Sequence, residues 1–133
     1  MRNLLIGLIA TVCLTASACK NEETEKRDNL AKTWRMDRVF LNGNDVTAVH
    51  NAAFTNYRIS FTRGGEFTET YVALGALSTT KNGTWSFFND FDGLKLEEGS
   101  DIRYYNFEKI EDNSLILTEQ TGNDLNRYEL LPQ

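Results

Sequence analysis

The stretch that decides the fold is YRISFTRGGEFTETY at residues 57–71. Its first part alternates apolar and polar side chains, which is the pattern of a β-strand with one buried face. Arg63-Gly64-Gly65 follows, and the glycine pair supplies the positive φ angles of a tight hairpin. A second strand is predicted over residues 66–74. One face of this hairpin carries Tyr57, Ile59, Phe61, Phe67 and Tyr71.

Similar short segments, separated by Gly, Asn and Asp, follow one another from Leu30 to the end of the chain. Further strands are predicted at residues 34–41, 84–87, 94–97, 102–110, 115–118 and 127–131. Together with the hairpin they make about eight strands, at the spacing expected of an antiparallel up-and-down barrel or a sandwich. The sequence therefore predicts an all-β fold.

Residues 45–54 break the alternating pattern and predict one short helix. A helix would place four apolar side chains on one face, those of Val46, Val49, Ala53 and Phe54. Asp45 or Thr47 can cap its first turn. Because the segment is short, only packing against the barrel would hold it in helical form.

Several short motifs resemble the lipocalin-like domains of small bacterial lipoproteins. They lie at residues 33–36, 61–68, 82–87, 115–118 and 127–128, so the resemblance covers about residues 30–131. It implies a barrel in which Trp34 plugs one end and Arg127 packs over it, although Lys32 stands where the family usually has Gly. An eight-stranded barrel either holds one small ligand or is filled by its own side chains. The sequence leaves both open.

Residues 1–18 are predicted to be a signal peptide. Arg2 is their only charge, and Leu4–Ala18 is an uncharged run of 15 residues, which is short for a bilayer-spanning helix. The run ends on Ala16-Ser17-Ala18 before Cys19. This arrangement resembles the bacterial lipoprotein signal, which implies cleavage before Cys19 and attachment of diacylglycerol to its thiol.

Cys13 is the only other cysteine, and a disulfide between it and Cys19 would close a very short loop with poor geometry. Lipidation of Cys19 is therefore the prediction. Residues 19–29 are predicted to be a lipidated charged tether without apolar side chains to bury, and residues 30–133 the barrel domain. Lys20 followed by acidic residues is similar to the surface-export signal of some Gram-negative lipoproteins. We expect an outer-membrane location, with periplasm-facing and cell-surface orientations both open.

The charge pattern disfavours two classes of partner. The formal net charge is −5, and no cluster of Lys or Arg is followed by aromatic residues that would stack on bases, so we expect no nucleic-acid binding. An acidic body is also not attracted to anionic lipid headgroups. The lipid on Cys19 is thus the only membrane attachment that the sequence predicts.

The sequence offers little chemistry. His50 is the single histidine, and with no second His and no Cys in the body it has no zinc-binding partners, so a surface or end-plugging role is favoured. Residues 89–93 have alternating oxygen side chains like part of a calcium loop but lack the closing acid in register, which favours a turn. We find no catalytic set, and predict no cofactor, no metal and no enzymatic activity.

Glu69 is the most interesting polar candidate, because it shares a strand face with Phe67 and Tyr71. The sequence does not settle whether it points into the barrel. An internal Glu69 would need a charged partner, Arg58 or Arg103, to offset its desolvation. The predicted ligand-binding set is Phe61, Phe67, Glu69, Tyr71, Trp85 and Phe107.

Two functions are compatible with these sequence features. One is a membrane-anchored barrel that binds a small apolar or amphipathic ligand. The other is an accessory lipoprotein whose filled barrel docks on a protein complex of the cell envelope. An interior cavity of roughly 300 Å³ or more would favour the first, and a packed interior the second.

Overall fold

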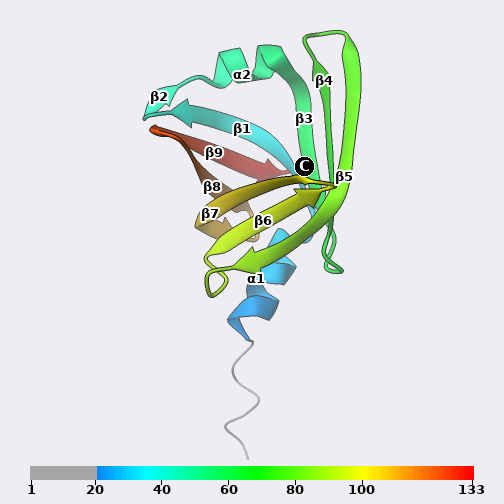
Figure 1. The fold of residues 1–133 in the computed structure, drawn as a ribbon, viewed down its shortest axis with the longest axis vertical. Coiled ribbons are helices and arrows are strands. Elements are labelled where there is room, and N and C mark those ends of the chain that lie inside the picture. The colour runs from blue at the N-terminus through cyan, green and yellow to red at the C-terminus, as the bar shows by residue number, and fades with distance from the viewer. Residues whose placement is uncertain (1–20) are drawn as a thin grey trace, which may run out of the picture.

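The computed structural model describes residues 21–133, which form a closed antiparallel β-barrel with a short helix at each end (Figure 1). The barrel strands are β1 (Thr33–Leu41), β3 (Phe54–Phe61), β4 (Glu66–Ala73), β5 (Leu77–Phe88), β6 (Gly93–Glu98), β7 (Asp101–Glu111), β8 (Ser114–Thr121) and β9 (Asp124–Pro132). β2 (Asn44–Asp45) is a two-residue strand that pairs only with β1. The predicted all-β, eight-stranded, up-and-down barrel is confirmed.

The barrel closes through the pairing of β1 with β9. The register extends from Trp34 opposite Pro132 to Leu41 opposite Asn126, with an irregularity between Met36 and Arg38. Every other barrel strand pairs with its neighbour in the chain. The β1–β3 pairing is the short one, with only Thr33–Arg35 opposite Arg58–Ser60. Beyond it the two strands separate, and α2 (Thr47–Ala53) contacts both of them.

The start of the predicted strand 84–87 is wrong. Asn82 and Gly83 lie inside β5, which pairs with β4 without interruption from Leu77 to Thr84. Gly83 is required by close packing and not by a turn: a Cβ there would lie 2.0 Å from the Glu97 carbonyl oxygen and 2.7 Å from the Phe67 ring.

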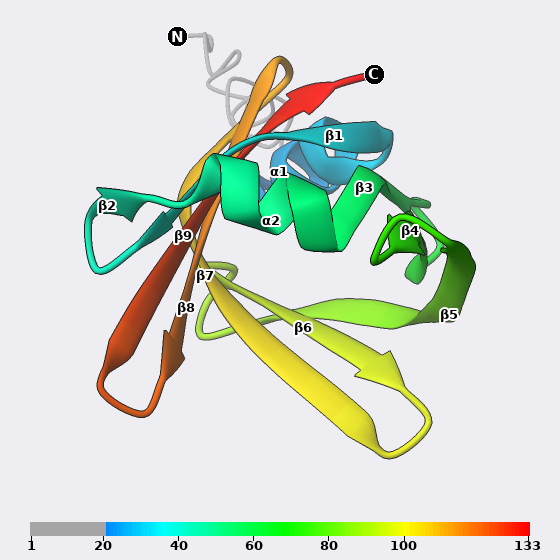
Figure 2. The same cartoon turned by 90° about the horizontal axis from the view of Figure 1, so that it is seen from above.

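The predicted helix is confirmed as α2 (Thr47–Ala53), which lies across one end of the barrel against β1 and β3 (Figure 2). Asp45 accepts a hydrogen bond from the Thr47 backbone N–H at 2.9 Å, one residue before the N-cap Val46, which makes no side-chain capping bond. The expected buried face is only partly correct. Val49 is 71% exposed, because α2 turns His50 rather than Val49 toward the barrel interior.

A second helix, α1 (Glu22–Leu30), replaces most of the predicted solvated tether and lies at the other end of the barrel (Figure 1). Two ion pairs stabilise it, each between residues one helical turn apart. They join Glu22 to Lys26 at 3.0 Å and Glu23 to Arg27 at 3.1 Å. The side chain of Asn21 caps its first turn by accepting from the Glu23 backbone N–H.

Long charged side chains attach α1 to the barrel, together with the fully buried Leu30 at its C-terminal end. The Arg27 guanidinium lies 4.7 Å from the centre of the Trp85 ring and donates to the Arg63 carbonyl at 2.9 Å. Lys26 donates to the Phe91 carbonyl at 2.9 Å. The sequence prediction failed here because it required apolar residues for docking, whereas the stems of Lys and Arg pack against aromatic surface.

The α1 end of the barrel is filled by the hydrophobic core. Trp34 is completely buried, and its indole N–H donates to the Leu30 carbonyl at 3.0 Å. The rest of this packing is supplied by Leu30, Phe61, Phe67, Trp85, Leu94 and Leu115.

Trp34 is buried as the resemblance implied, but the expected partner is wrong. Lys32, not Arg127, lies over its ring, with the amino group 5.4 Å from the ring centre. Arg127 pairs in register with Phe40, toward the opposite end of β1, and stacks on that ring.

The predicted signal peptide at residues 1–18, the lipid-attachment residue Cys19 and Cys13 all lie outside the described residues. None of the helices in residues 21–133 combines the length and the apolar character needed to span a bilayer.

Candidate functional site

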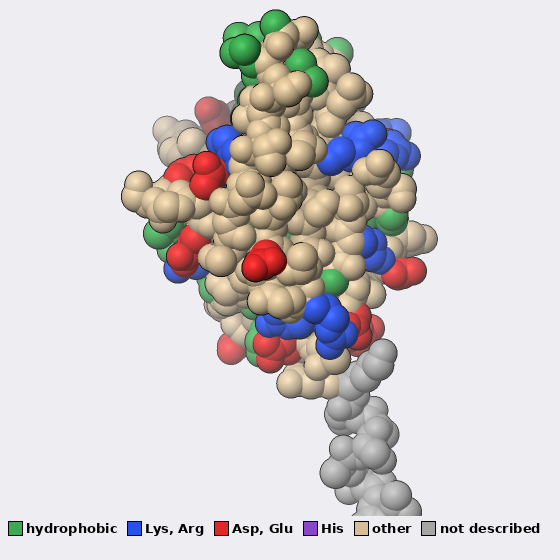
Figure 3. All heavy atoms as spheres, turned by 90° about the vertical axis from the view of Figure 1, so that its right-hand side faces the viewer, with side chains coloured by type: hydrophobic (Ala, Val, Ile, Leu, Met, Phe, Trp, Pro, Cys, Tyr) green, Lys and Arg blue, Asp and Glu red, His purple; other side chains and the backbone are tan. Residues whose placement is uncertain are grey.

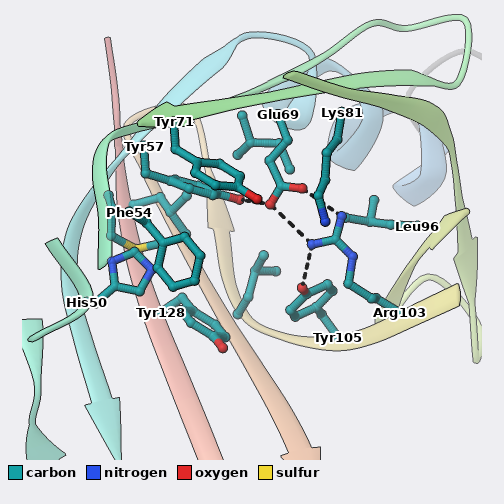
Figure 4. A pocket seen from close by; sticks show the side chains of 14 residues that line it. His50, Phe54, Tyr57, Glu69, Tyr71, Lys81, Leu96, Arg103, Tyr105 and Tyr128 are labelled. Carbon is teal, nitrogen blue, oxygen red and sulfur yellow. Dashed lines mark hydrogen bonds and ion pairs between the residues drawn. The ribbon is translucent and has the colours of Figure 1, made fainter. Parts of the chain in front are cut away.

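The interior of the barrel holds a pocket of about 260 Å³ beside α2. Its apolar wall consists of Met36, Ile59, Leu96, Leu117 and Leu130. Polar and aromatic side chains from α2, β3, β4, β5, β7 and β9 complete the lining, and Figure 4 shows them converging on the interior. The site is thus an apolar cup with a group of charged and hydroxyl side chains on one side.

Glu69 is the centre of this polar group. It points into the barrel and is 4% exposed, which settles the orientation that the sequence left open. The Arg103 guanidinium holds the carboxylate with two hydrogen bonds, at 3.1 Å to Oε1 and 2.7 Å to Oε2. The Tyr57 hydroxyl donates to Oε1 at 2.6 Å. Of the two partners considered, the structure selects Arg103; Arg58 instead donates to the Tyr57 carbonyl.

These contacts fix the charge state of the pair. Burial alone would raise the pKa of Glu69, but the hydrogen bonds from Arg103 and Tyr57 outweigh it and hold the pKa below its ordinary value. Burial by itself would lower the pKa of Arg103. The hydrogen bonds to the Glu69 carboxylate outweigh burial and raise that pKa above its ordinary value. Both groups are therefore charged at neutral pH.

Three tyrosines in the pocket keep their hydroxyl protons. Burial, reinforced by the negative charge of Glu69, raises the pKa of Tyr57 well above its ordinary value. Burial also raises the pKa of Tyr105 to about 12. The pKa of Tyr128 is raised by burial and by Glu119, which accepts its hydroxyl hydrogen bond at 3.1 Å. These hydroxyls are neutral hydrogen-bonding groups at physiological pH.

His50 lies at the α2 side of the pocket, packed against Phe54 with 5.0 Å between the ring centres. Its Nδ1 atom is buried and has no hydrogen-bond partner among the described residues. Burial lowers the pKa of His50, so the ring is neutral at pH 7. The favoured end-plugging role fits this position, and within residues 21–133 no group of three or more His, Cys, Asp or Glu side chains is placed to hold a metal ion.

The structure brings together only part of the predicted ligand-binding set. Glu69 and Tyr71 line the pocket. Four aromatic residues do not: Phe61, Phe67 and Trp85 are buried in the core, and Phe107 packs against that core. The ligand-binding role of all six residues stays a prediction.

Several pocket residues were not predicted from the sequence, namely Tyr57, Lys81, Tyr105 and Tyr128 as polar groups and Leu117 and Leu130 as apolar ones. One signal was available. Lys81 precedes Gly83 and Trp85 at alternate positions, so it lies on the inward face of one continuous strand. Because the predicted strand began at Thr84, Lys81 fell outside it and was not considered as an inward-facing residue.

The segment at residues 89–93 forms the turn between β5 and β6, as favoured from the sequence. Three consecutive residues, Asn89, Asp90 and Phe91, have positive φ. Lys26 of α1 contacts Asp92 at 3.4 Å as well as the Phe91 carbonyl. The turn therefore takes part in docking α1.

No protein-family model matches the chain, and no curated protein matches it. Solved structures do resemble it in fold, and three of them illustrate the likeness. A lipocalin-like protein from Bacteroides uniformis has a TM-score of 0.60 at 15% identity, over 79% of this chain and 99% of that one. An uncharacterised protein from Bacteroides eggerthii has a TM-score of 0.55 at 10% identity, over 78% and 99% of the two chains.

The third structure, lobster apocrustacyanin A1, has a TM-score of 0.58 at 16% identity and matches over 84% of this chain and 65% of that one. At such low identities the likeness concerns the fold alone. The chain has a lipocalin-like barrel.

Proposed function

We propose that this protein is a membrane-anchored lipocalin-like lipoprotein that binds a small apolar or amphipathic ligand in the pocket beside α2, and that it is not an enzyme. The observation that carries the proposal is the pocket of about 260 Å³ with a buried ion pair in an otherwise apolar cup. Its volume falls just short of the roughly 300 Å³ that would favour ligand binding, so the volume by itself does not separate binding from filling. The buried ion pair beside the unfilled volume makes that distinction.

The ion pair supports binding over simple filling of the barrel. Burying Glu69 and Arg103 requires desolvation of both charges, and well-packed apolar side chains of similar volume are often at least as stabilising. At the α1 end of the same barrel, apolar residues do fill the interior. Charged groups placed beside an unfilled volume are suited to orienting a ligand.

Membrane attachment through a lipid on Cys19 is part of the proposal, with an outer-membrane location that faces either the periplasm or the cell surface. α1 begins three residues after Cys19 and lies at the closed end of the barrel. Anchoring there would leave the α2 end, with the pocket, free. Replacing Cys19 with Ser should move the protein from the membrane fraction to the soluble one; continued fractionation with membranes would refute the anchor.

Ligand binding is tested on residues 20–133, which contain every strand and the whole core cluster. We expect native mass spectrometry of this acyl-free body to show a bound species after gentle purification, and the neutral dye Nile red to brighten on binding. A body that always has its bare mass, and that leaves the dye dark, would contradict the proposal.

A pair of matched variants locates the binding. Leu117→Trp adds volume to a residue that lines the pocket, whereas Leu125→Trp adds the same side chain at an exposed position. Dye binding should be lost in Leu117→Trp and retained in Leu125→Trp. Equal binding by the two variants would place the dye elsewhere.

The alternative, an accessory lipoprotein that docks on an envelope complex, is favoured by one observation. The turn between β4 and β5 exposes apolar side chains, with Leu74 80% and Leu77 66% exposed, and hydrophobic side chains gather at the top of Figure 3. Exposed apolar patches mark interaction surfaces. Crosslinking in intact cells that yields no reproducible partner, or a partner unaffected by Leu74→Ser with Leu77→Ser, would count against this function.

A further inference from the structure

The pocket contains a cation that the Glu69–Arg103 pair does not neutralise. Lys81 lies directly opposite Glu69 in the register of β4 and β5, so the two side chains share the inward face. Figure 4 shows Lys81 pointing into the pocket beside Glu69. Within residues 21–133 its amino group makes no ion pair and no hydrogen bond to the protein, although its charge favours the ionised form of Glu69.

Charge among the lining side chains is therefore unbalanced. Arg103 and Lys81 are positive, Glu69 is negative and His50 is neutral, which leaves one positive charge in excess. A buried or half-buried charge without a counter-ion is costly unless a ligand or water compensates it.

Hydrogen-bonding capacity is unbalanced in the same direction. The Glu69 carboxylate already accepts three hydrogen bonds, from Tyr57 and twice from Arg103. Tyr105 accepts a hydrogen bond from Arg103 at 3.4 Å, so its own proton is left to donate. The Tyr71 hydroxyl also has no partner among the described residues. A hydroxyl both donates and accepts, so the surplus comes from Lys81, which has three N–H donors and no acceptor. The pocket thus offers more donors than acceptors.

We propose that the ligand carries an anionic head, such as a carboxylate, which binds at Lys81, while its apolar body contacts the wall formed by Leu96, Leu117 and Leu130. This inference rests on the proposed ligand-binding function and adds the chemical class of the ligand. Lys81 determines the specificity, because Glu69 already neutralises Arg103 through two hydrogen bonds.

One nearby acidic residue defines where the anion would sit. Glu119 on β8 accepts the Tyr128 hydrogen bond and is not among the residues that line the pocket. β8 is three strands away from β5 in the barrel order. An anion is thus repelled from the β8 side and attracted to the side of Lys81.

The test compares decanoate with 1-decanol, which match in length and differ in charge, by titration calorimetry with residues 20–133 at low ionic strength. We expect decanoate to bind about tenfold more tightly, because charge-assisted hydrogen bonds are the stronger ones. Lys81→Met should remove this preference and leave decanol binding unchanged. Lys109→Met is the control, since Lys109 lies outside the pocket and pairs with Glu111.

Each outcome has a defined meaning. Equal binding of decanoate and decanol to the unaltered protein would overturn the anionic-head inference and leave the proposed function standing. A preference that survives Lys81→Met would overturn the role of Lys81. If neither compound binds, the anionic-head inference is overturned together with the proposed binding of amphipathic ligands.

Discussion

The two ends of the barrel are built from the same strands and are chemically different. At the α1 end, inward side chains such as Trp34, Phe67 and Trp85 fill the interior and are almost completely buried. At the α2 end, inward side chains surround a pocket and include Glu69 and Arg103. Phe67 and Glu69 are only two residues apart on one face of β4.

This difference shows that the depth of a residue along its strand determines its role as much as the face on which it lies. The inward face of β4 carries Phe67, Glu69 and Tyr71, which lie successively in the core, at the buried ion pair and in the pocket wall. The alternating pattern places all three inside. It does not place any of them at a particular depth.

The largest effect is expected at the closed end, from Trp34→Ala. Trp34 is fully buried, so removing the indole leaves a cavity. It also removes one of the two hydrogen bonds to the Leu30 carbonyl, which still accepts from the Lys32 backbone N–H at 2.8 Å. We expect the free energy of unfolding to fall by about 3–5 kcal/mol, measured by urea denaturation. Trp34→Phe should cost less, and a Trp34→Ala protein of unchanged stability would contradict the assignment of this end as the core.

At the α2 end, Arg103→Met should be destabilising for an electrostatic reason. It leaves the Glu69 carboxylate buried without its main partner, and we expect a loss of about 2–3 kcal/mol at pH 7. The paired change Glu69→Leu with Arg103→Met should recover much of that loss. No recovery in the double variant would mean that packing, not charge, sets the effect.

The same pair predicts a pH dependence. Because the pKa of Glu69 is lowered on folding, its ionised form stabilises the native protein above its ordinary pKa of 4.5, and this contribution disappears as the pH falls through the lower folded value. Arg103→Met removes the hydrogen bonds that chiefly counteract burial, so the pKa of Glu69 is raised in that variant. The stability gap between the two proteins should therefore narrow from pH 7 to pH 4.5, and a constant gap would refute the linkage.

A smaller effect is expected where α1 docks. Arg27→Ala removes the stacking on Trp85 and the hydrogen bond to the Arg63 carbonyl, which should lower the free energy of unfolding by roughly 0.5–1 kcal/mol. Arg27→Lys keeps the charge but loses the planar stacking. Its free energy of unfolding should lie between those of the unaltered protein and Arg27→Ala. An unchanged fluorescence spectrum of Trp85 in Arg27→Ala would argue against the docked helix.

The smallest effect is expected at the rim, from Leu74→Ser. Leu74 is among the most exposed apolar side chains and contributes no packing to either end. The free energy of unfolding should change by less than about 0.5 kcal/mol in urea denaturation. A larger loss would show that the rim belongs to the packed structure.

The sequence allowed the barrel, its strand number and the helix α2 to be predicted, because alternation and turn residues are local signals. It did not allow the pocket to be predicted. Arg103 lies on β7 and Glu69 on β4, and their meeting depends on the shear of the closed barrel, which no local pattern reports.

The helix α1 was missed for a different reason. Its docking depends on Arg27 reaching Trp85, far away in the sequence, although the ion pair between Glu22 and Lys26 is a helix signal within the segment itself.

The most direct test of the two-ended barrel is an NMR titration of residues 20–133 with decanoate. Both indole N–H groups, those of Trp34 and Trp85, report on the closed end through their bonds to Leu30 and Thr62. Backbone signals of Glu69, Lys81 and Arg103 report on the pocket. We predict that the pocket signals shift in a saturable way while both indole signals stay in place. Shifts of the indole signals with unmoved pocket signals would contradict the account.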